Sequence, residues 1–230
     1  MEKADMQGKK TLNTLSEEEL MLLQDYSWES TIQNFMNHMQ VYNAGIKEIK
    51  TKLEILDEEF RTRYDYNPIH HIESRLKSPK SILGKIRAKG LSMTYESIRE
   101  NITDIAGVRV ICNYIDDIYR VADLLIGQDD VQLVRVRDYI KTPKPSGYRS
   151  LHLIVKIPIF LAESTELVAV EIQIRTIAMD FWASLEHKLK YKTGNIVSEE
   201  LRERLKLCAD SISSIDQEMQ SIHTTLQQQQ

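Results

Sequence analysis

Two long series of apolar residues, one near each end of the chain, constrain the fold more than any other feature. Their steps alternate between four and three residues, which places each series on one face of a helix. The first consists of Phe35, Met39, Tyr42, Ile46, Ile49, Leu53, Leu56 and Phe60, and the second of Leu201, Leu205, Cys208, Ile212, Ile215, Met219, Ile222 and Leu226. We therefore predict two long amphipathic helices, which either cover the core of the chain or meet another subunit. Both interpretations stay open.

The sequence between these two series has the alternating pattern of strands. A capping box at Ser16 predicts that helix begins before the first series. Further along, the pattern predicts, in order, a helix from Ser78-Pro79 to Gly90, a strand over 104–113, a helix from 116 to 127, strands over 131–138, 151–159 and 167–175, and a helix over 176–192. His70 and His71 are assigned to a turn after Pro68. This order is typical of an α+β fold with a mixed β-sheet of four to five strands flanked by helices.

Composition and charge exclude several classes of protein. There is no run of eighteen apolar residues and the N-terminus has no apolar signal region, so we expect a cytoplasmic protein with no membrane partner. The formal net charge of −4 argues against general nucleic-acid binding. Cys112 and Cys208 lack the spacing of metal ligands and are predicted to be buried, reduced thiols.

Two local groups of basic residues stand out from this acidic background. Residues 75–89 carry six basic side chains and no acidic one, and the expected helix N-terminus at Ser78 offers backbone N–H groups to a phosphate. The second group contains Arg135, Arg137, Lys141, Lys144 and Arg149 and surrounds the glycine loop before Tyr148 and His152. A tyrosine beside arginine can stack on a base while the cations hold phosphates. Solvated surface charge is the alternative for each group, but the two together favour a polyphosphate ligand.

Carboxylates lie on two of the expected strands. In VAVEIQIRT the alternation puts Glu171, Gln173 and Arg175 on one face, which is therefore directed to water or to a site. Asp104 opens the apolar segment that contains Arg109. Two such acids next to basic loops suit a Mg²⁺ ion that is also bound by substrate phosphates, while structural ion pairs with Arg109 or Arg175 are the alternative. No pattern of a catalytic serine or cysteine, and no phosphate-binding glycine motif, is present.

Several blocks of the sequence resemble the (p)ppGpp synthetase domain of Rel/Spo proteins, in the order of that family. They are the R-x-K-x₃-S-I-x₂-K pattern from Arg75, then DIAGVR, RDYI, SGYRSLH, VEIQIRT and DFWASLEH. We expect the stand-alone form, a small alarmone synthetase, in one nucleotidyltransferase-like domain over 1–230. Its core would span about 75–192, with helical extensions over 16–60 and 198–226 used in oligomerisation and frayed ends at 1–12 and 227–230.

The resemblance implies transfer of pyrophosphate from ATP to the 3′-hydroxyl of GDP or GTP, giving AMP and (p)ppGpp in the bacterial stringent response. It implies Mg²⁺ as cofactor, with Asp104 and Glu171 as catalytic residues and metal ligands, Glu171 alternatively acting as the base. It assigns ATP binding to Arg75, Lys77, Ser81, Lys85 and Arg109, and GDP or GTP binding to Arg137, Lys144, Tyr148, His152, Gln173 and Asp180. Arg175 and Glu186 are expected to be site neighbours.

The sequence departs from the family pattern in two respects. Asp180 stands where some relatives have Asn, which puts its contact with guanine in doubt. Glu54 and Asp57 fall where one subgroup has basic residues that bind the activating alarmone between subunits, so we expect little or no activation by pppGpp.

The resemblance also implies a homotetramer, while the preferred acceptor and any modulation by RNA remain open. The rival hypotheses are a catalytically silent nucleotide- or RNA-binding regulator and an enzyme that adds nucleotides to RNA. Retention of Asp104 and Glu171 argues against the first rival, and the net negative charge argues against the second.

Overall fold

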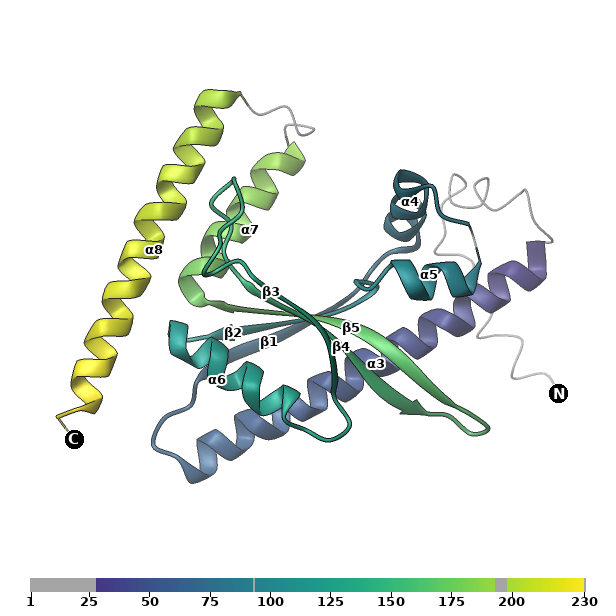
Figure 1. Cartoon of the computed structure of the whole chain (residues 1–230), viewed down its shortest axis with the longest axis horizontal. Helices are drawn as coiled ribbons and strands as arrows, with labels where there is room; N and C mark the ends of the chain where they lie inside the picture. Colours follow the sequence, from purple (N-terminus) through teal and green to yellow (C-terminus); the bar gives the residue numbers. More distant parts are fainter. Residues whose placement is uncertain (1–27, 93, 193–197, 230) are drawn as a thin grey trace. The chain divides into compact units, whose positions relative to one another are not determined.

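The computed structural model describes residues 28–92, 94–192 and 198–229 of the chain (Figure 1). The helix start expected at Ser16 and the frayed end expected over 1–12 lie outside the described residues. Within the described ranges, no helix combines the length and the apolar character that a membrane span requires.

The chain divides into two compact units. The first combines the residues up to Val41 with Lys77–Ile102, and the second combines Tyr42–Leu76 with the residues from Thr103 onward. Helix α3 (Trp28–Arg63) contributes to both units. The expectation of one domain over the whole chain stays a prediction.

The first unit contains the two short helices α4 (Pro79–Lys89) and α5 (Tyr95–Asn101). Helix α4 begins and ends where the sequence predicts, because Ser78 accepts a hydrogen bond from the backbone N–H of Ser81 and Gly90 adopts the left-handed conformation at φ 63°. Helix α5 was not predicted. Lys89 Nζ donates to the backbone oxygen of Asn101 at 2.9 Å and so links the two helices.

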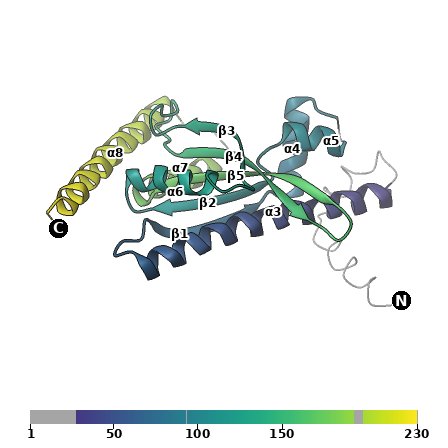
Figure 2. The same ribbon diagram turned by 60° about the horizontal axis from the view of Figure 1, so that its bottom comes forward.

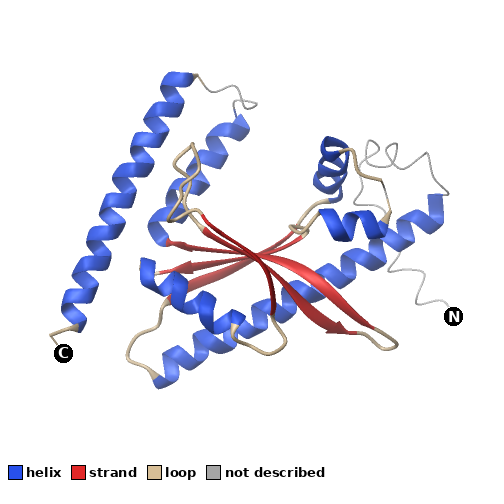
Figure 3. Ribbon diagram, in the orientation of Figure 1, coloured by secondary structure: helices blue, strands red, loops and turns tan. Residues whose placement is uncertain are grey.

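A mixed sheet of five strands forms the centre of the second unit (Figure 3). Its strands are β1 (Ile69–Leu76), β2 (Ala106–Cys112), β3 (Gln132–Asp138), β4 (Leu151–Phe160) and β5 (Thr165–Thr176), in the spatial order β1-β2-β5-β4-β3. Strands β2 and β5 are parallel, and all other neighbours are antiparallel. The predicted α+β class and the mixed sheet are thereby confirmed.

One face of this sheet, which we call the core face, is apolar and covered by helices. It carries the alternate residues Val168, Val170, Ile172 and Ile174 of β5, all of which are buried. The part of α3 from Tyr42 onward lies along it (Figure 2), and a Cβ atom at Gly45 would come within 2.9 Å of Val168. Helix α6 (Ile115–Ile126) lies beside α3, where Arg120 covers the ring of Phe60 at 4.9 Å. Five residues of the first apolar series are therefore buried in the core of the second unit, namely Tyr42, Ile46, Ile49, Leu53 and Phe60.

The second apolar series, on the C-terminal helix, is buried only in part. Helix α8 (Glu199–Gln227) packs on α7 (Ile177–Lys192) through Leu205, Ala209 and Ile212, which surround Trp182. The indole Nε1 of Trp182 donates to the backbone oxygen of Leu205 at 3.0 Å. The remaining large residues of the series are exposed, namely Leu201, Ile215, Met219, Ile222 and Leu226. This helix thus buries little of its apolar series within the chain.

Two expectations were wrong. His70 and His71 lie in β1 and not in a turn, because residues after Pro68 pair with β2 as the edge strand, with a register shift between Ile69 and His71. Cys208 is exposed, although Cys112 is buried as expected. The reason is that α8 meets α7 along a line of residues that includes Ala209, so the neighbouring position 208 is turned away.

Candidate functional site

The second face of the sheet, which we call the polar face, gathers most of the predicted site residues. Residues paired across neighbouring strands share a face, and the register pairs Glu73 with Arg109, Arg109 with Gln173, and Gln173 with His152. Glu171 lies two residues before Gln173 on the same face. The face therefore carries a row of charged and amide groups that crosses β1, β2, β5 and β4. The prediction that this side of β5 is not core is confirmed.

Glu171 is held in place by two neighbours on this face. The side-chain amide of Gln173 donates to Oε2 of Glu171 at 2.9 Å, and Nδ1 of His152 lies 3.5 Å from Oε1. Burial raises the pKa of the Glu171 carboxyl, but these contacts with His152 and Gln173 outweigh it and hold the pKa below its usual range. Glu171 therefore remains ionised while it is largely shielded from water, as a general base or a metal ligand must be.

Asp104 lies just before β2 and is half-buried. Its negative charge acts on Glu171 and works to raise that residue's pKa, so the two carboxylates are within electrostatic reach of each other. A pair of this kind fits Mg²⁺, which proteins commonly hold with one or two carboxylates while substrate phosphates and water complete the octahedron. No group of three or more candidate metal ligands occurs among the described residues.

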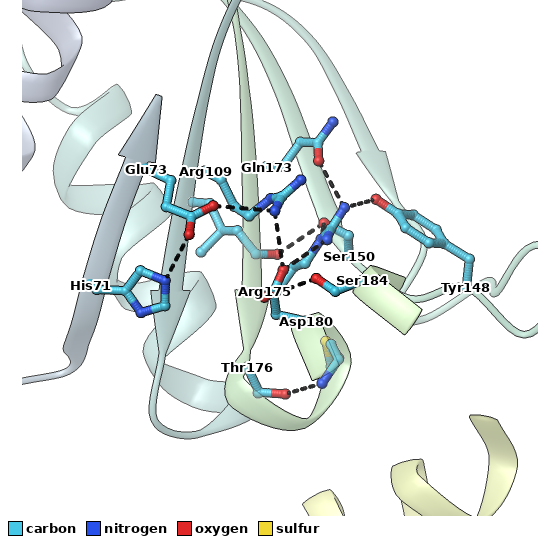
Figure 4. A network of polar contacts seen from close by, with 12 residues as sticks. His71, Glu73, Arg109, Tyr148, Ser150, Gln173, Arg175, Thr176, Asp180 and Ser184 are labelled. Atoms are coloured by element: carbon cyan, nitrogen blue, oxygen red, sulfur yellow. Dashed lines mark hydrogen bonds and ion pairs between the residues drawn. The ribbon is translucent and has the colours of Figure 1, made fainter. Parts of the chain in front are cut away.

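Arg175, at the end of β5, is the centre of a polar network (Figure 4). Its side chain is almost fully buried, and its guanidinium donates to Gln173 Oε1 at 2.8 Å, to the Tyr148 hydroxyl at 2.5 Å and to Asp180 Oδ1 at 3.0 Å. The Tyr148 hydroxyl also lies 2.8 Å from Nε2 of His152. Since His152 also contacts Glu171, the network connects Glu171 of β5 to Tyr148.

The same network extends toward β1. Asp180 Oδ1, on the first turn of α7, lies 3.4 Å from a guanidinium nitrogen of Arg109. That nitrogen lies 3.3 Å from Glu73 of β1. Arg109 and Arg175 were each considered as partners of a strand carboxylate, but in the structure both reach Asp180. The two strand arginines therefore have carboxylate partners. Both contact Asp180 of α7, and Arg109 also contacts Glu73 of β1.

Residues 141–150 form the Tyr148 loop, which joins β3 to β4. Gly147 adopts φ 88°, a conformation that side chains other than glycine rarely take. Lys144 Nζ lies 4.6 Å from the ring centroids of both Tyr139 and Tyr148. The loop thus presents an aromatic ring with cations around it, as the sequence predicts for a site that binds a base and its phosphates.

The other predicted residues lie at several places. Arg137 pairs with His152 across β3 and β4, and Arg75 lies on β1 opposite Gly107, on the same face as Arg109. Glu186 lies further along α7 and is half-buried. Lys77, Ser81 and Lys85 belong to the first unit, where Ser81 contacts the hydroxyl of Ser78 at 2.9 Å beside the N-terminus of α4. The structure therefore brings together the residues predicted on the sheet, the Tyr148 loop and the start of α7.

Sequence reasoning missed two residues that hold this site together. Glu73 contacts Arg109 from a strand that was not predicted, although the alternation in IHHIESRL would have placed Glu73 and Arg75 on one face. Asp210 of α8 pairs with Arg149 of the Tyr148 loop at 3.0 Å. No local pattern marks Asp210, because its partner lies 61 residues away.

Comparisons with known proteins point to one family. A family model described as a region found in RelA and SpoT proteins matches residues 74–196. The chain is 45% identical over 194 residues to GTP pyrophosphokinase YwaC of Bacillus subtilis, which covers 84% of this chain and 92% of that protein.

Two solved structures are also similar. Small alarmone synthetase 2 of B. subtilis has a TM-score of 0.76 at 45% identity and covers 84% of this chain and 99% of its own. Small alarmone synthetase 1 of the same organism, bound to its product pppGpp, has a TM-score of 0.78 at 36% identity and covers 84% of this chain and 98% of its own.

Proposed function

Since the chain belongs to the RelA/SpoT family and is a small alarmone synthetase, we propose that the polar face of its sheet is where the reaction takes place. The chain is a GTP pyrophosphokinase: it makes (p)ppGpp from ATP and a guanosine nucleotide, as expected from its motifs. In the proposed reaction, the 3′-oxygen of GDP or GTP attacks the β-phosphorus of ATP. The bond from that phosphorus to the oxygen shared with the α-phosphate breaks, and AMP leaves.

The observation that best supports this proposal is the state of Glu171. Its contacts with His152 and Gln173 keep the carboxylate ionised within a largely buried setting. We propose that it accepts the proton of the 3′-hydroxyl as the new bond to phosphorus forms. General base catalysis of this kind contributes about 10²- to 10⁴-fold in rate.

We propose Mg²⁺ as the cofactor, held by Asp104 and Glu171. When bound, the metal would neutralise charge on the phosphates of ATP. Asp104 would act only as a ligand of the ion. Glu171 would act either as a second ligand or only as the general base. The positions of these two acids at neighbouring parallel strands support the assignment.

For ATP, we propose that Arg75 and Arg109 hold the adenine and that Lys77, Ser81 and Lys85 hold the phosphates. Arg75 and Arg109 lie on one face of adjacent strands, and a guanidinium group stacks well on a flat ring. Ser81 lies in the first turn of α4, where the helix dipole favours an anion.

For GDP or GTP, we propose that Tyr148 stacks on the base and that Lys144, Arg137 and His152 bind phosphates or ribose. Gln173 and Asp180 are proposed as further acceptor-site residues, with Arg175 and Glu186 as neighbours. Lys144 Nζ lies over the Tyr148 ring, 4.6 Å from its centroid. An arriving base would displace that ammonium group, which would then be available to a phosphate.

We also propose that the protein is a cytoplasmic homotetramer with one synthetase domain, acting in the stringent response. Little or no activation by pppGpp is expected, because the acidic Glu54 and Asp57 fall where one subgroup has basic residues that bind the alarmone. A several-fold rise in the rate of synthesis on adding pppGpp would contradict this last proposal.

The test is product analysis with labelled ATP, GDP and Mg²⁺, comparing wild type with the Glu171→Gln variant. Wild type is expected to form ppGpp and AMP, and Glu171→Gln to lose at least a factor of about 10² in rate while still binding both nucleotides. Glu163→Gln, a change at an exposed acid in the β4–β5 turn, serves as the control and should behave as wild type. Nucleotide binding without product from wild type would favour the silent regulator, and AMP without a 3′-pyrophosphorylated guanosine would favour another transferase.

A further inference from the structure

One carboxylate oxygen stands between the two arginines of the polar face. Asp180 Oδ1 lies 3.0 Å from a guanidinium nitrogen of Arg175 and 3.4 Å from one of Arg109. The second oxygen, Oδ2, accepts a hydrogen bond from Ser184 Oγ at 3.4 Å. With its side chain only 20% exposed, this carboxylate is occupied by protein donors (Figure 4).

On the ATP side, Arg109 depends on this carboxylate for its orientation. Its guanidinium lies between Asp180 and Glu73, at 3.4 Å and 3.3 Å. Its Nε is buried and has no hydrogen-bond partner within the described part of the chain. Among the described residues, loss of the Asp180 charge would leave Glu73 as the ion-pair partner of Arg109, and Glu73 is 55% exposed and therefore a weak restraint.

On the acceptor side, Tyr148 depends on Asp180 through Arg175. The Arg175 guanidinium lies 5.0 Å from the centroid of the Tyr148 ring and donates to its hydroxyl. Because Arg175 is 4% exposed, its charge needs a nearby carboxylate, and Asp180 supplies it. The position of the ring that we propose to stack on guanine is therefore set in part by Asp180.

We infer that Asp180 is a positioning residue that couples the binding of ATP to the binding of the guanosine acceptor. This inference rests on the proposed function, in which Arg109 contacts adenine and Tyr148 contacts guanine. Binding of one nucleotide fixes one arginine, which fixes the shared carboxylate and with it the other arginine. The second nucleotide then meets a site that is already ordered, so it binds more tightly.

The inference differs from a direct contact between Asp180 and guanine. A residue that only reads the base would change acceptor affinity and leave the effect of one nucleotide on the other unaltered. A coupling residue changes that mutual effect itself, which is the same in both directions by thermodynamic linkage.

The experiment measures how tightly α,β-methylene-ATP binds in the presence of Mg²⁺, with and without saturating GDP. This analogue prevents transfer because a methylene group replaces the oxygen between the α- and β-phosphorus atoms, and the resulting bond from carbon to phosphorus is not cleaved. The ratio of the two dissociation constants is the coupling factor, expected to be at least about 5 for wild type. In Asp180→Asn the factor should fall to within about twofold of one, and Asp180→Glu, which keeps the charge, should recover part of it.

Ser184→Ala is the matched control, because it removes a contact of Asp180 without touching either arginine, and it should keep the wild-type factor. Should Asp180→Asn fail to fold, Arg109→Lys breaks the same link from its other end and should also bring the factor near one. A wild-type factor near one, or an Asp180→Asn factor equal to wild type, would overturn the inference. Failure of the proposed function has a separate sign, since it would appear as absence of ppGpp in the product assay whatever the coupling.

Discussion

Arg149 and Asp210 form an ion pair of 3.0 Å that joins the Tyr148 loop to the long C-terminal helix α8. Arg149 also donates to the backbone oxygens of Gly147 and Ala209, at 3.0 Å and 3.3 Å. Helix α8 is therefore a support for the loop that we propose to bind the acceptor base. Its contribution is to positioning, because none of its residues belongs to the row of groups on the polar face.

The first prediction concerns this support. Asp210→Ala should raise the KM for GDP several-fold and change kcat less, because the loop loses one restraint while the groups on the sheet remain. Asp210 is 50% exposed, and exposed ion pairs contribute about 0.2–1 kcal/mol, so the free energy of unfolding should hardly change. Steady-state kinetics with varied GDP would test this, with Glu218→Ala, an exposed acid on the same helix, as the control. Equal KM values for Asp210→Ala and wild type would contradict it.

The second prediction concerns the close contact between Gly147 and Ala209. A Cβ atom at Gly147 would lie 2.6 Å from the Cβ of Ala209, and the backbone there has φ 88°. Gly147→Ala should therefore lower the free energy of unfolding by about 1–3 kcal/mol and displace the Tyr148 loop. The measurements are urea unfolding and the KM for GDP.

Gly84 offers a matched control for this change. It lies inside α4, and a Cβ atom there would have no neighbour within 4 Å. Gly84→Ala should thus stabilise the protein by about 0.5–1 kcal/mol through helix propensity. If both alanine variants changed stability in the same direction, the steric explanation for Gly147 would be wrong.

The strands and helices with strong periodicity were predictable from the sequence. Strand β5 alternates so regularly that its core face and its polar face follow directly from VAVEIQIRT, and α4 has a capping serine and a terminal glycine. Strand β1 was missed because the repeated histidines and the charges of IHHIESRL hide an edge strand, whose outer side has no partner in the sheet. Its assignment depends on pairing with β2, a contact that local patterns do not contain.

The sequence was sufficient to predict which residues belong to the candidate site, but not which ion pairs hold them in place. The resemblance assigned Glu171, Tyr148 and His152 to one site, and the structure brings them together on the polar face. The contacts of Asp180 with Arg109 and of Asp210 with Arg149 depend on how α7 and α8 pack, which is decided by Trp182 and Ala209 in three dimensions. Long-range ion pairs of this kind leave no spacing in the sequence.

The third prediction concerns the pH dependence of stability. Burial raises the pKa of the Asp216 carboxyl above its ordinary value of 3.8, although its hydrogen bond from Thr176 opposes the rise. A carboxyl with a higher pKa when folded binds its proton more tightly in the folded state. Its ionisation therefore lowers the free energy of unfolding as the pH rises from about 4 through the raised pKa.

Asp216→Asn keeps an acceptor for Thr176 but cannot ionise. This variant should be more stable than wild type at pH 7, and the difference should shrink as the pH falls to 4. Urea midpoints at the two pH values would show this, with the exposed Asp129→Asn as the control. The buried Asp117, whose pKa burial also raises, remains in both proteins, so only part of the wild-type pH dependence should disappear.

The fourth prediction concerns the exposed series on α8. Ile215, Met219 and Ile222 are 62%, 47% and 46% exposed and follow the spacing of a helix–helix seam. Single soluble chains seldom leave a continuous apolar stripe of this kind in water, and a second copy of α8 would cover it. If the proposed homotetramer uses this surface, the double change Ile215→Glu and Ile222→Glu should reduce the molar mass measured by light scattering to that of a smaller species.

Ile215 and Ile222 are exposed, so replacing them with Glu should not disturb the fold of the chain. Neither contributes to the Trp182 core, so the circular dichroism spectrum and the thermal unfolding of the separated chain should show that its fold is retained. The matched control is Glu218→Gln, on the same helix, which should keep the mass of wild type. A variant that keeps the wild-type mass would place the contact between subunits elsewhere. A wild-type mass equal to one chain would remove the tetramer from the proposal and leave the exposed part of the α8 series uncovered in solution.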